Sequence, residues 1–229
     1  NVKIMLINVT GDIMDEIIKR FKALDTTCVS DALDKLGIKC ALYDIKPIIE
    51  GSKICGPAFT VHYVPCGMVK GTVGDFLDDV KPGEVIVIDN SGRTNCTVWG
   101  DIMSIVASKA GIEGTLIDGV CRDIPAIKKL KYPLFTKGYY MSTGKDRVEV
   151  DAVNIPVSIS DVQVRPGDII LGDDSGAIVI PKDVAEEVLK IAETIDEKEK
   201  KIEEEILKGT PLREAREKFN YHHLQTKID

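Results

Sequence analysis

The stretch GDIMSIVASKAGIEGTLIDGVCRDIPAIKKLKYP, residues 100–133, decides the fold class. Apolar residues at helical spacing predict a helix over 100–110. An apolar run then predicts a strand over 114–118, and a second helix is expected over 123–130. A strand enclosed by two helices is typical of an α/β fold.

Working outward, the flanking sequence adds strands on both sides of this stretch. The predicted strands cover residues 54–64, 84–89, 133–136, 148–159, 168–171 and 177–180. The predicted helices cover residues 11–24, a short helix that starts at Ser30 and Asp31 and ends at Gly37, residues 182 to about 208, and a polar tail after Pro211. Strands alternate with helices and then cluster, which predicts a mixed sheet or a layered sandwich. Because no low-complexity linker divides the chain, we expect one domain over 1–181 and a helical extension over 182–229.

Two segments of the chain resemble each other. Residues 80–86 (VKPGEVI) and 164–170 (VRPGDII) both place Pro-Gly before an apolar run. A type II turn that feeds a strand explains each segment locally. Two related turns within one sheet are the alternative interpretation.

Composition limits the function classes. The chain has 229 residues, 44% of them hydrophobic, and a formal net charge of −7. The chain is long enough to bury a sizeable hydrophobic core. Its excess of acidic residues argues against an extended contact with the phosphate backbone of a nucleic acid. No apolar run is long enough to span a membrane, and residues 1–9 lack the marks of a signal peptide, so we expect a cytoplasmic protein. Since the chain begins with Asn, we also expect it to be trimmed or part of a longer protein.

Cysteine and histidine usage narrows the choice of metal. None of the six cysteines forms a CxxC pair, and only three histidines occur. Zinc-ribbon and thioredoxin-like sites are therefore poor interpretations. A bound metal should be a hard cation held by oxygen atoms, such as Mg²⁺ or Mn²⁺.

Polar residues follow the central predicted strand and open the helix before it. Arg122 and Asp123 come just past the strand's carboxyl end, where open α/β sheets bind ligands. Gly100 and Asp101 begin a helix whose free amides can hold an anion. The planar guanidinium group of Arg122 suits a carboxylate, because it can donate two parallel hydrogen bonds. Asp123 or Asp101 could hold a divalent cation.

Each of these residues also has a structural interpretation. Asp123 before Ile124-Pro125 would make a good helix N-cap, and Asp101 a good first-turn acid. Arg122 alone would more often form a surface ion pair. The adjacent Arg-Asp pair, twenty residues after an acid at another helix start, favours a site.

This spacing resembles the metal-dependent class II pyruvate aldolases that act on 4-hydroxy-4-methyl-2-oxoglutarate and related oxo acids. That family shares its fold with the RraA-like regulators of ribonuclease E. The shared pattern is an acid, twenty residues, then Arg-Asp: here Asp101 followed by Arg122-Asp123. Further matching segments are SDAL at 30–33, GPAFTV at 56–61, IDG at 117–119 and DDSGAIVIP at 173–181. The likeness covers roughly residues 20–210.

The resemblance implies a layered β/β/α fold like a phosphohistidine swivelling domain, assembled as a homotrimer or homohexamer. It implies that Asp123 is the protein ligand of Mg²⁺ or Mn²⁺, and that Asp101 holds a water on the metal. Arg122 would bind the oxo acid. Backbone amides after Gly100 would bind its carboxylate; they belong to Ile102, Met103 and Ser104.

The resemblance also implies a glutamate supplied by the C-terminal helix of a neighbouring subunit. Apolar residues along that helix are Val184, Val188, Ile191, Ile195, Ile202 and Ile206. Glu199 stands in the seven-residue gap, where a carboxylate is costly without a partner. Glu199 is therefore the candidate and Glu197 the second choice. A simply solvated, charge-rich helix end remains the alternative.

The predicted reaction is retro-aldol cleavage of a 4-hydroxy-2-oxo acid to release pyruvate, with oxaloacetate decarboxylation as a side activity. A divalent cation and Arg122 would stabilise the developing enolate charge, and a water held by Asp101 or Glu199 could move the proton. Some members carry an acid three residues after Arg-Asp, and Ala126 stands there. The sequence therefore does not define which residues bind the far end of the substrate.

Three other functions fit the sequence less well. A non-catalytic RraA-like regulator would act on a ribonuclease by protein contact, and the retained Asp101, Arg122 and Asp123 favour the enzyme instead. A methyltransferase would need a Gly-rich loop after a first strand, and the sequence has none. A phosphotransfer domain would need a histidine, and His62 lies in a β-rich run where packing is the better interpretation.

Overall fold

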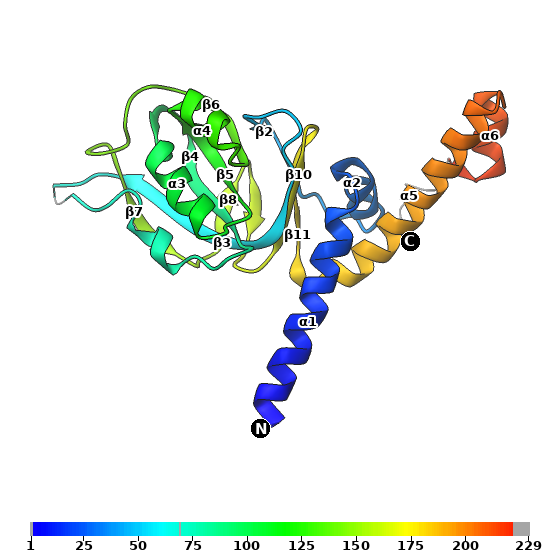
Figure 1. Cartoon of the computed structure of the whole chain (residues 1–229), viewed down its shortest axis with the longest axis horizontal. Helices are drawn as coiled ribbons and strands as arrows, with labels where there is room; N and C mark the ends of the chain where they lie inside the picture. Colours follow the sequence, from blue (N-terminus) through cyan, green and yellow to red (C-terminus); the bar gives the residue numbers. More distant parts are fainter. Residues whose placement is uncertain (1, 69, 222–229) are drawn as a thin grey trace. The chain divides into compact units, whose positions relative to one another are not determined.

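The computed structural model describes residues 2–68 and 70–221, which form two compact units (Figure 1). The sheet unit runs from Ala41 to Lys182. The helical unit takes the described residues up to Cys40 and from Asp183 onward. No helix in the described ranges is both long and apolar enough to cross a membrane.

The sheet unit is built on a nine-stranded mixed sheet. Its order is β1-β11-β10-β3-β4-β5-β6-β2, with β7 paired to β3, and β8 and β9 form a separate hairpin. The strands are β1 Ala41–Leu42, β2 Lys46–Pro47, β3 Ile54–Pro65, β4 Val85–Thr97, β5 Gly114–Cys121, β6 Leu134–Tyr139, β7 Val148–Val153, β8 Val157–Ile159, β9 Val162–Val164, β10 Ile169–Asp173 and β11 Gly176–Ile180. Strands β3 to β6 run parallel, and the other pairs are antiparallel.

The parallel strands carry the site because helices connect them. Helix α3 (Asp101–Lys109) joins β4 to β5, and α4 (Ile124–Leu130) joins β5 to β6. Right-handed crossovers of this kind place both helices on one face of the sheet, as Figure 1 shows. Trp99, Ala107 and Ile127 belong to the apolar core beneath them.

A second β layer covers the opposite face. A Cβ added to Gly172 on β10 would lie 2.9 Å from the ring of Phe135 on β6 and 3.0 Å from Ile54. Strands β10 and β6 are far apart in the sheet order, so this contact requires the sheet to fold over itself. The expected α/β class, with a mixed sheet and layered β/β/α packing, is confirmed.

The two Pro-Gly turns belong to one sheet. Gly83 and Gly167 both adopt left-handed backbone, with φ of 81° and 83°. The turns feed β4 and β10, and these strands flank β3 on its two sides. The interpretation as two related turns in one sheet therefore fits the structure.

The helical unit consists of α1 Val2–Lys22, α2 Thr26–Lys35, α5 Ala185–Leu207 and α6 Leu212–Lys218, with a short 3₁₀ turn Lys182–Val184 before α5. Helix α2 packs against α5. Arg20 on α1 donates from Nε to Glu193 Oε1 on α5 at 2.8 Å. The predicted long C-terminal helix is present.

Several element boundaries differ from the prediction; the strand expected over 84–89, for example, continues as β4 to Thr97. The first helix begins at Val2 rather than at residue 11. Ser30 and Asp31 lie inside α2, because Asp25 takes the N-cap position in extended backbone. The single strand expected over 148–159 is broken into β7 and β8, and Asn154 at the break has a left-handed φ of 53°.

The predicted domain boundary at 181/182 lies beside the boundary between the units at Lys182/Asp183. The residues before Ala41 group with the helical unit instead of the sheet. The physical reason is the amphipathic face of α2, which buries Val29 and Leu33 and packs against α5.

Candidate functional site

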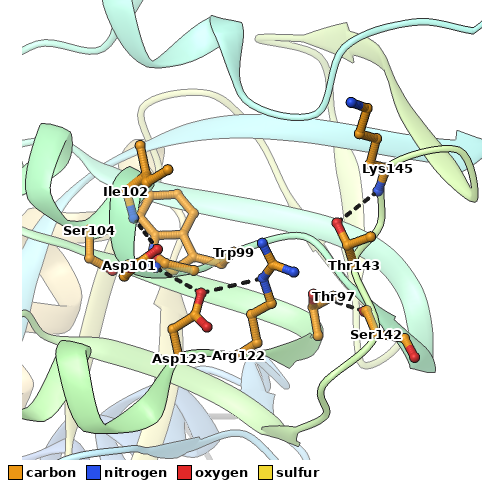
Figure 2. A network of polar contacts seen from close by, with 11 residues as sticks. Thr97, Trp99, Asp101, Ile102, Ser104, Arg122, Asp123, Ser142, Thr143 and Lys145 are labelled. Carbon is orange, nitrogen blue, oxygen red and sulfur yellow. Dashed lines mark hydrogen bonds and ion pairs between the residues drawn. The ribbon is translucent and has the colours of Figure 1, made fainter.

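The predicted site residues of the sheet unit meet where β4 and β5 end. The amide of Arg122 donates to the carbonyl of Trp99 at 3.0 Å and ties the two strand ends together. This bond brings the Gly100-Asp101 pair beside Asp123 (Figure 2). Arg122 and Asp123 thus follow the carboxyl end of β5 and Gly100-Asp101 open α3, as the sequence predicts, and the structure brings the two pairs together.

Asp123 is held in an unusual backbone conformation. It precedes α4 with φ 60° and ψ 36°, in the left-handed region that non-glycine residues rarely adopt. Its side chain makes no capping hydrogen bond to α4. Instead, Oδ2 lies 3.3 Å from the amide of Asp101 and 3.3 Å from Nε of Arg122. The capping interpretation therefore fails, and the carboxylate faces the β4–α3 turn.

Gly100 makes room for this carboxylate. A Cβ at position 100 would lie 2.6 Å from Oδ2 of Asp123 and 3.4 Å from Nε of Arg122. The backbone of Gly100 is extended, with φ −154°, so any residue could adopt it. Glycine is required at position 100 because a side chain there would collide with the carboxylate of Asp123 beside Arg122.

The start of α3 is fixed by a chain of hydrogen bonds. The indole of Trp99 donates to Oγ of Ser104 at 2.8 Å, and that hydroxyl donates to the carbonyl of Gly100, also at 2.8 Å. The Ser104 amide donates to the same carbonyl at 3.1 Å. Asp101 accepts the amide of Ile102 at 2.7 Å. Ser104 is buried and thus positions the turn, while Ile102 reaches the surface.

A pocket of about 420 Å³ opens over this turn. Its lining includes Asp101, Ile102, Met103 and Arg122, all of them predicted or adjacent to predicted site residues. It also includes residues that sequence reasoning missed, namely the loop 71–75, Thr97, Thr143 and Lys145. Thr97 donates from its amide to Ser142 at 3.0 Å, a contact between distant segments that no local pattern signals.

The residues present fit a hard cation with few protein ligands. Asp123 and Asp101 offer carboxylate oxygens at the two strand ends. Within residues 2–68 and 70–221, no group of three or more His, Cys, Asp and Glu side chains is arranged around a common metal position. Mg²⁺ often binds through one or two carboxylates and keeps several waters, so this donor set suits it.

Glu199 lies in the helical unit, on α5. It is partly buried, and the flanking Ile195 and Ile202 are buried, so a carboxylate does interrupt the apolar seam. Burial, followed by the nearby acids Asp31, Glu203 and Asp196, raises the pKa of the Glu199 carboxyl. Glu197 is exposed. The role of Glu199 in a site stays a prediction.

His62 and two buried thiols take no part in the pocket lining. Nδ1 of His62 on β3 lies 3.1 Å from the carboxylate of Asp151 on the neighbouring strand β7, so the histidine already has a partner there. Burial raises the pKa of the Cys28 thiol to about 11 and that of the Cys121 thiol to about 12. Neither thiol is a nucleophile near neutral pH.

Named relatives cover much of the chain. Protein DlpA of Legionella pneumophila is 40% identical over 217 residues, which is 93% of this chain and 35% of DlpA. The chain thus spans about a third of DlpA's length. A protein of Halalkalibacterium halodurans named "Putative 4-hydroxy-4-methyl-2-oxoglutarate aldolase" is 38% identical over 77% of this chain and 82% of its own length.

Solved structures share the fold. A crystal structure of a Pseudomonas syringae pv. tomato protein matches with a TM-score of 0.82 and 41% identity over 88% of this chain and 97% of its own. RraAS2 of Streptomyces coelicolor, described as an unusual member of the RNase ES inhibitor RraA family, matches with a TM-score of 0.74 and 27% identity over 81% of this chain and 94% of its own. The family model described as RraA-like (Aldolase/RraA) matches residues 26–179. The chain belongs to the RraA-like family.

Proposed function

We propose that this chain is a divalent-metal-dependent lyase that cleaves a 4-hydroxy-2-oxo acid by a retro-aldol reaction and releases pyruvate. Decarboxylation of oxaloacetate is the proposed side activity, because it generates the same three-carbon enolate. Mg²⁺ or Mn²⁺ is the proposed cofactor, bound by Asp123. The name of the Halalkalibacterium halodurans relative supports this reaction class.

The observation that carries the proposal is the Asp123 carboxylate. A residue at a helix N-cap normally bonds the helix's first amides, and Asp123 does not. Its left-handed backbone and the space left by Gly100 direct the carboxylate toward Arg122 and the α3 start. Strained backbone of this kind persists where the surrounding structure fixes it, commonly at functional sites.

Each residue has a defined part in the proposed reaction. When bound, a divalent cation supplies Lewis-acid stabilisation of negative charge on the substrate's oxo group. Arg122 donates hydrogen bonds to the oxygen that gains charge as the carbon–carbon bond breaks. The Met103 amide holds the substrate's carboxylate, joined by the Ile102 amide once it leaves the Asp101 carboxylate, and Gly100 and Ser104 shape that turn.

Proton transfer falls to Asp101 and Glu199. Asp101 takes the proton that leaves the 4-hydroxyl, directly or through one water. We propose that the chain forms a homotrimer or homohexamer and that Glu199 of a partner subunit completes the site. The partial burial of Glu199 on α5 and the raised pKa of its carboxyl support a proton-carrying role.

A pyruvate-release assay tests the proposed function. We expect release from 4-hydroxy-4-methyl-2-oxoglutarate and from oxaloacetate with Mg²⁺ or Mn²⁺, and none with EDTA. Arg122→Ala and Asp123→Ala should lose this activity, whereas Arg165→Ala, at an exposed arginine outside the pocket, should keep it. Metal-independent release, or wild-type rates from Asp123→Ala, contradicts the proposal.

A ribonuclease regulator is the second candidate, because RraAS2 belongs to an RNase inhibitor family and shares the fold. Such a regulator would act through protein contact without the metal site. Inhibition of a purified ribonuclease by wild-type chain and by Asp123→Ala alike would favour it. Metal-dependent pyruvate release without such inhibition would exclude it.

A further inference from the structure

Lys145 is a second cation in the lining of the pocket, at a distance from the α3 start. The pocket is lined by Asp101 and Ile102 as well as by Thr143 and Lys145. Figure 2 shows Arg122 between these two groups, with Ile102 on one side and Lys145 on the other. A ligand held at the α3 amides and Arg122 would therefore occupy a pocket whose lining also includes Lys145.

The backbone that carries Lys145 is fixed against the end of β4. A Cβ on Gly144 would lie 2.4 Å from the carbonyl oxygen of Thr97, so the two backbones are in close contact. The Thr97 amide and hydroxyl donate to the Ser142 carbonyl at 3.0 and 3.1 Å. The Lys145 amide donates to Oγ1 of Thr143 at 3.2 Å. The lysine thus extends from a defined point on the pocket rim.

The charges around Lys145 are already paired elsewhere. Asp146 forms an ion pair with Lys70 at 2.7 Å, and Arg147 donates to the Thr143 carbonyl at 3.0 Å. Over the described ranges, the Lys145 ammonium has no carboxylate within ion-pair distance, not even the two lining acids Asp75 and Asp101. Most exposed lysines are solvated and bind nothing. Lys145 differs because its backbone is held at a pocket that also contains Arg122.

We propose that Lys145 is a specificity-determining residue that binds a second carboxylate at the far end of the substrate. The site would then select dicarboxylic 2-oxo acids over monocarboxylic ones of the same chain length. This inference rests on the proposed function, because it assumes that the first carboxylate binds at the α3 amides. A charge-assisted bond at an open rim should weaken as ionic strength rises.

Binding of two unreactive acids separates this inference from catalysis. Calorimetry on the full chain with Mn²⁺ would compare 2-oxoglutarate with 2-oxopentanoate, which lacks the far carboxylate. We expect the wild type to prefer 2-oxoglutarate. Lys145→Ala should lose about 10- to 100-fold in affinity for 2-oxoglutarate and less than about twofold for 2-oxopentanoate. Lys145→Arg should keep most of the preference, and Lys109→Ala, at an exposed lysine outside the lining, should keep all of it.

Steady-state kinetics of cleavage give an independent check. With 4-hydroxy-4-methyl-2-oxoglutarate, Lys145→Ala should raise KM and leave kcat nearly unchanged. Pyruvate release with no loss of selectivity in Lys145→Ala would overturn the Lys145 inference alone. Selective binding without any cleavage would overturn the proposed function and leave Lys145 as a binding residue. Absence of preference in the wild type would overturn the inference outright. Because Lys145 is exposed, the variant should fold, and circular dichroism checks this.

Discussion

Asp123 in the sheet unit and Glu199 in the helical unit are both predicted site acids, and the structure prepares them in opposite ways. Asp123 is directed by backbone geometry, through its left-handed conformation, the missing cap bond and the space beside Gly100. Glu199 is affected by its environment, because burial and neighbouring acids raise its pKa. One carboxylate is fixed beside Arg122 by geometry, and the pKa of the other is raised by its surroundings.

The difference assigns the two acids different tasks. A carboxylate beside an arginine at two strand ends is suited to hold a cation and a substrate. A carboxylate with a raised pKa keeps its proton to a higher pH than an ordinary glutamate does, which suits a proton carrier. Removing one contact at a time tests whether this division holds.

The largest expected effect comes from Asp123→Ala. Loss of the carboxylate removes the proposed metal ligand and the partner of Arg122, so pyruvate release should fall by at least about 10²–10³-fold. The thermal unfolding temperature should fall by only a few degrees, because Asp123 makes no capping bond to α4 and the contacts it loses, to the Asp101 amide and to Arg122, are partly exposed. Initial rates with Mg²⁺ and a thermal melt check both statements. Asp79→Asn, an exposed acid outside the pocket lining, is the control.

Gly100→Ala probes the same geometry without removing a charge. The new Cβ would lie 2.6 Å from Oδ2 of Asp123, so the carboxylate has to move. We expect activity to fall about 10- to 100-fold while the fold is kept. Gly67→Ala is the matched control, since a Cβ there has nothing within 4 Å. Equal rates for Gly100→Ala and wild type would show that this spacing is unimportant.

Glu199→Gln tests whether burial and neighbouring acids raise the pKa of Glu199. The test is the pH dependence of thermal stability. The raised pKa means that the folded chain binds the Glu199 proton more tightly than the unfolded chain, so ionised Glu199 disfavours folding near pH 7. The glutamine variant should melt up to a few degrees higher at pH 7. The gain should vanish below about pH 4, where glutamate is protonated in both states. Glu197→Gln, at an exposed site, should show no such pH dependence.

Ser104→Ala is expected to affect stability and not the chemistry of the site. This change removes the hydroxyl that links the Trp99 indole to the Gly100 carbonyl and leaves the buried indole N–H without its partner. We expect a loss of about 1–3 kcal/mol in the free energy of unfolding. Urea unfolding beside Ser108→Ala, an exposed serine of the same helix, measures it. Equal losses for the two variants would argue against the link.

The sequence predicts the parts of the site that follow from local order. An apolar run identifies β5, and the residues directly after it, Arg122 and Asp123, must lie at the carboxyl end of a parallel strand. Asp101 follows from the predicted start of helix α3. The gap in the α5 seam predicts a partly buried acid at Glu199 because helix periodicity is local, and its role in the site stays a prediction.

Features that depend on distant contacts could not be predicted. Thr97 meets Ser142 across 45 residues, and this contact is one of those that place Lys145 at the pocket. The start of α2 was misplaced, since Ser30 and Asp31 favour caps by composition but Asp25 holds the extended backbone. The left-handed conformation of Asp123 has no sequence signal, because an Asp before Ile-Pro reads equally well as a normal cap.

Metal add-back is the most direct test of the central claim. One preparation of the chain would be assayed for pyruvate release from 4-hydroxy-4-methyl-2-oxoglutarate as purified, after EDTA treatment, and after addition of excess Mn²⁺. The account predicts that EDTA abolishes release, that Mn²⁺ restores it in the wild type, and that Mn²⁺ restores nothing in Asp123→Ala. Release that survives EDTA, or restoration in Asp123→Ala equal to the wild type, would contradict a metal-dependent lyase built on Asp123.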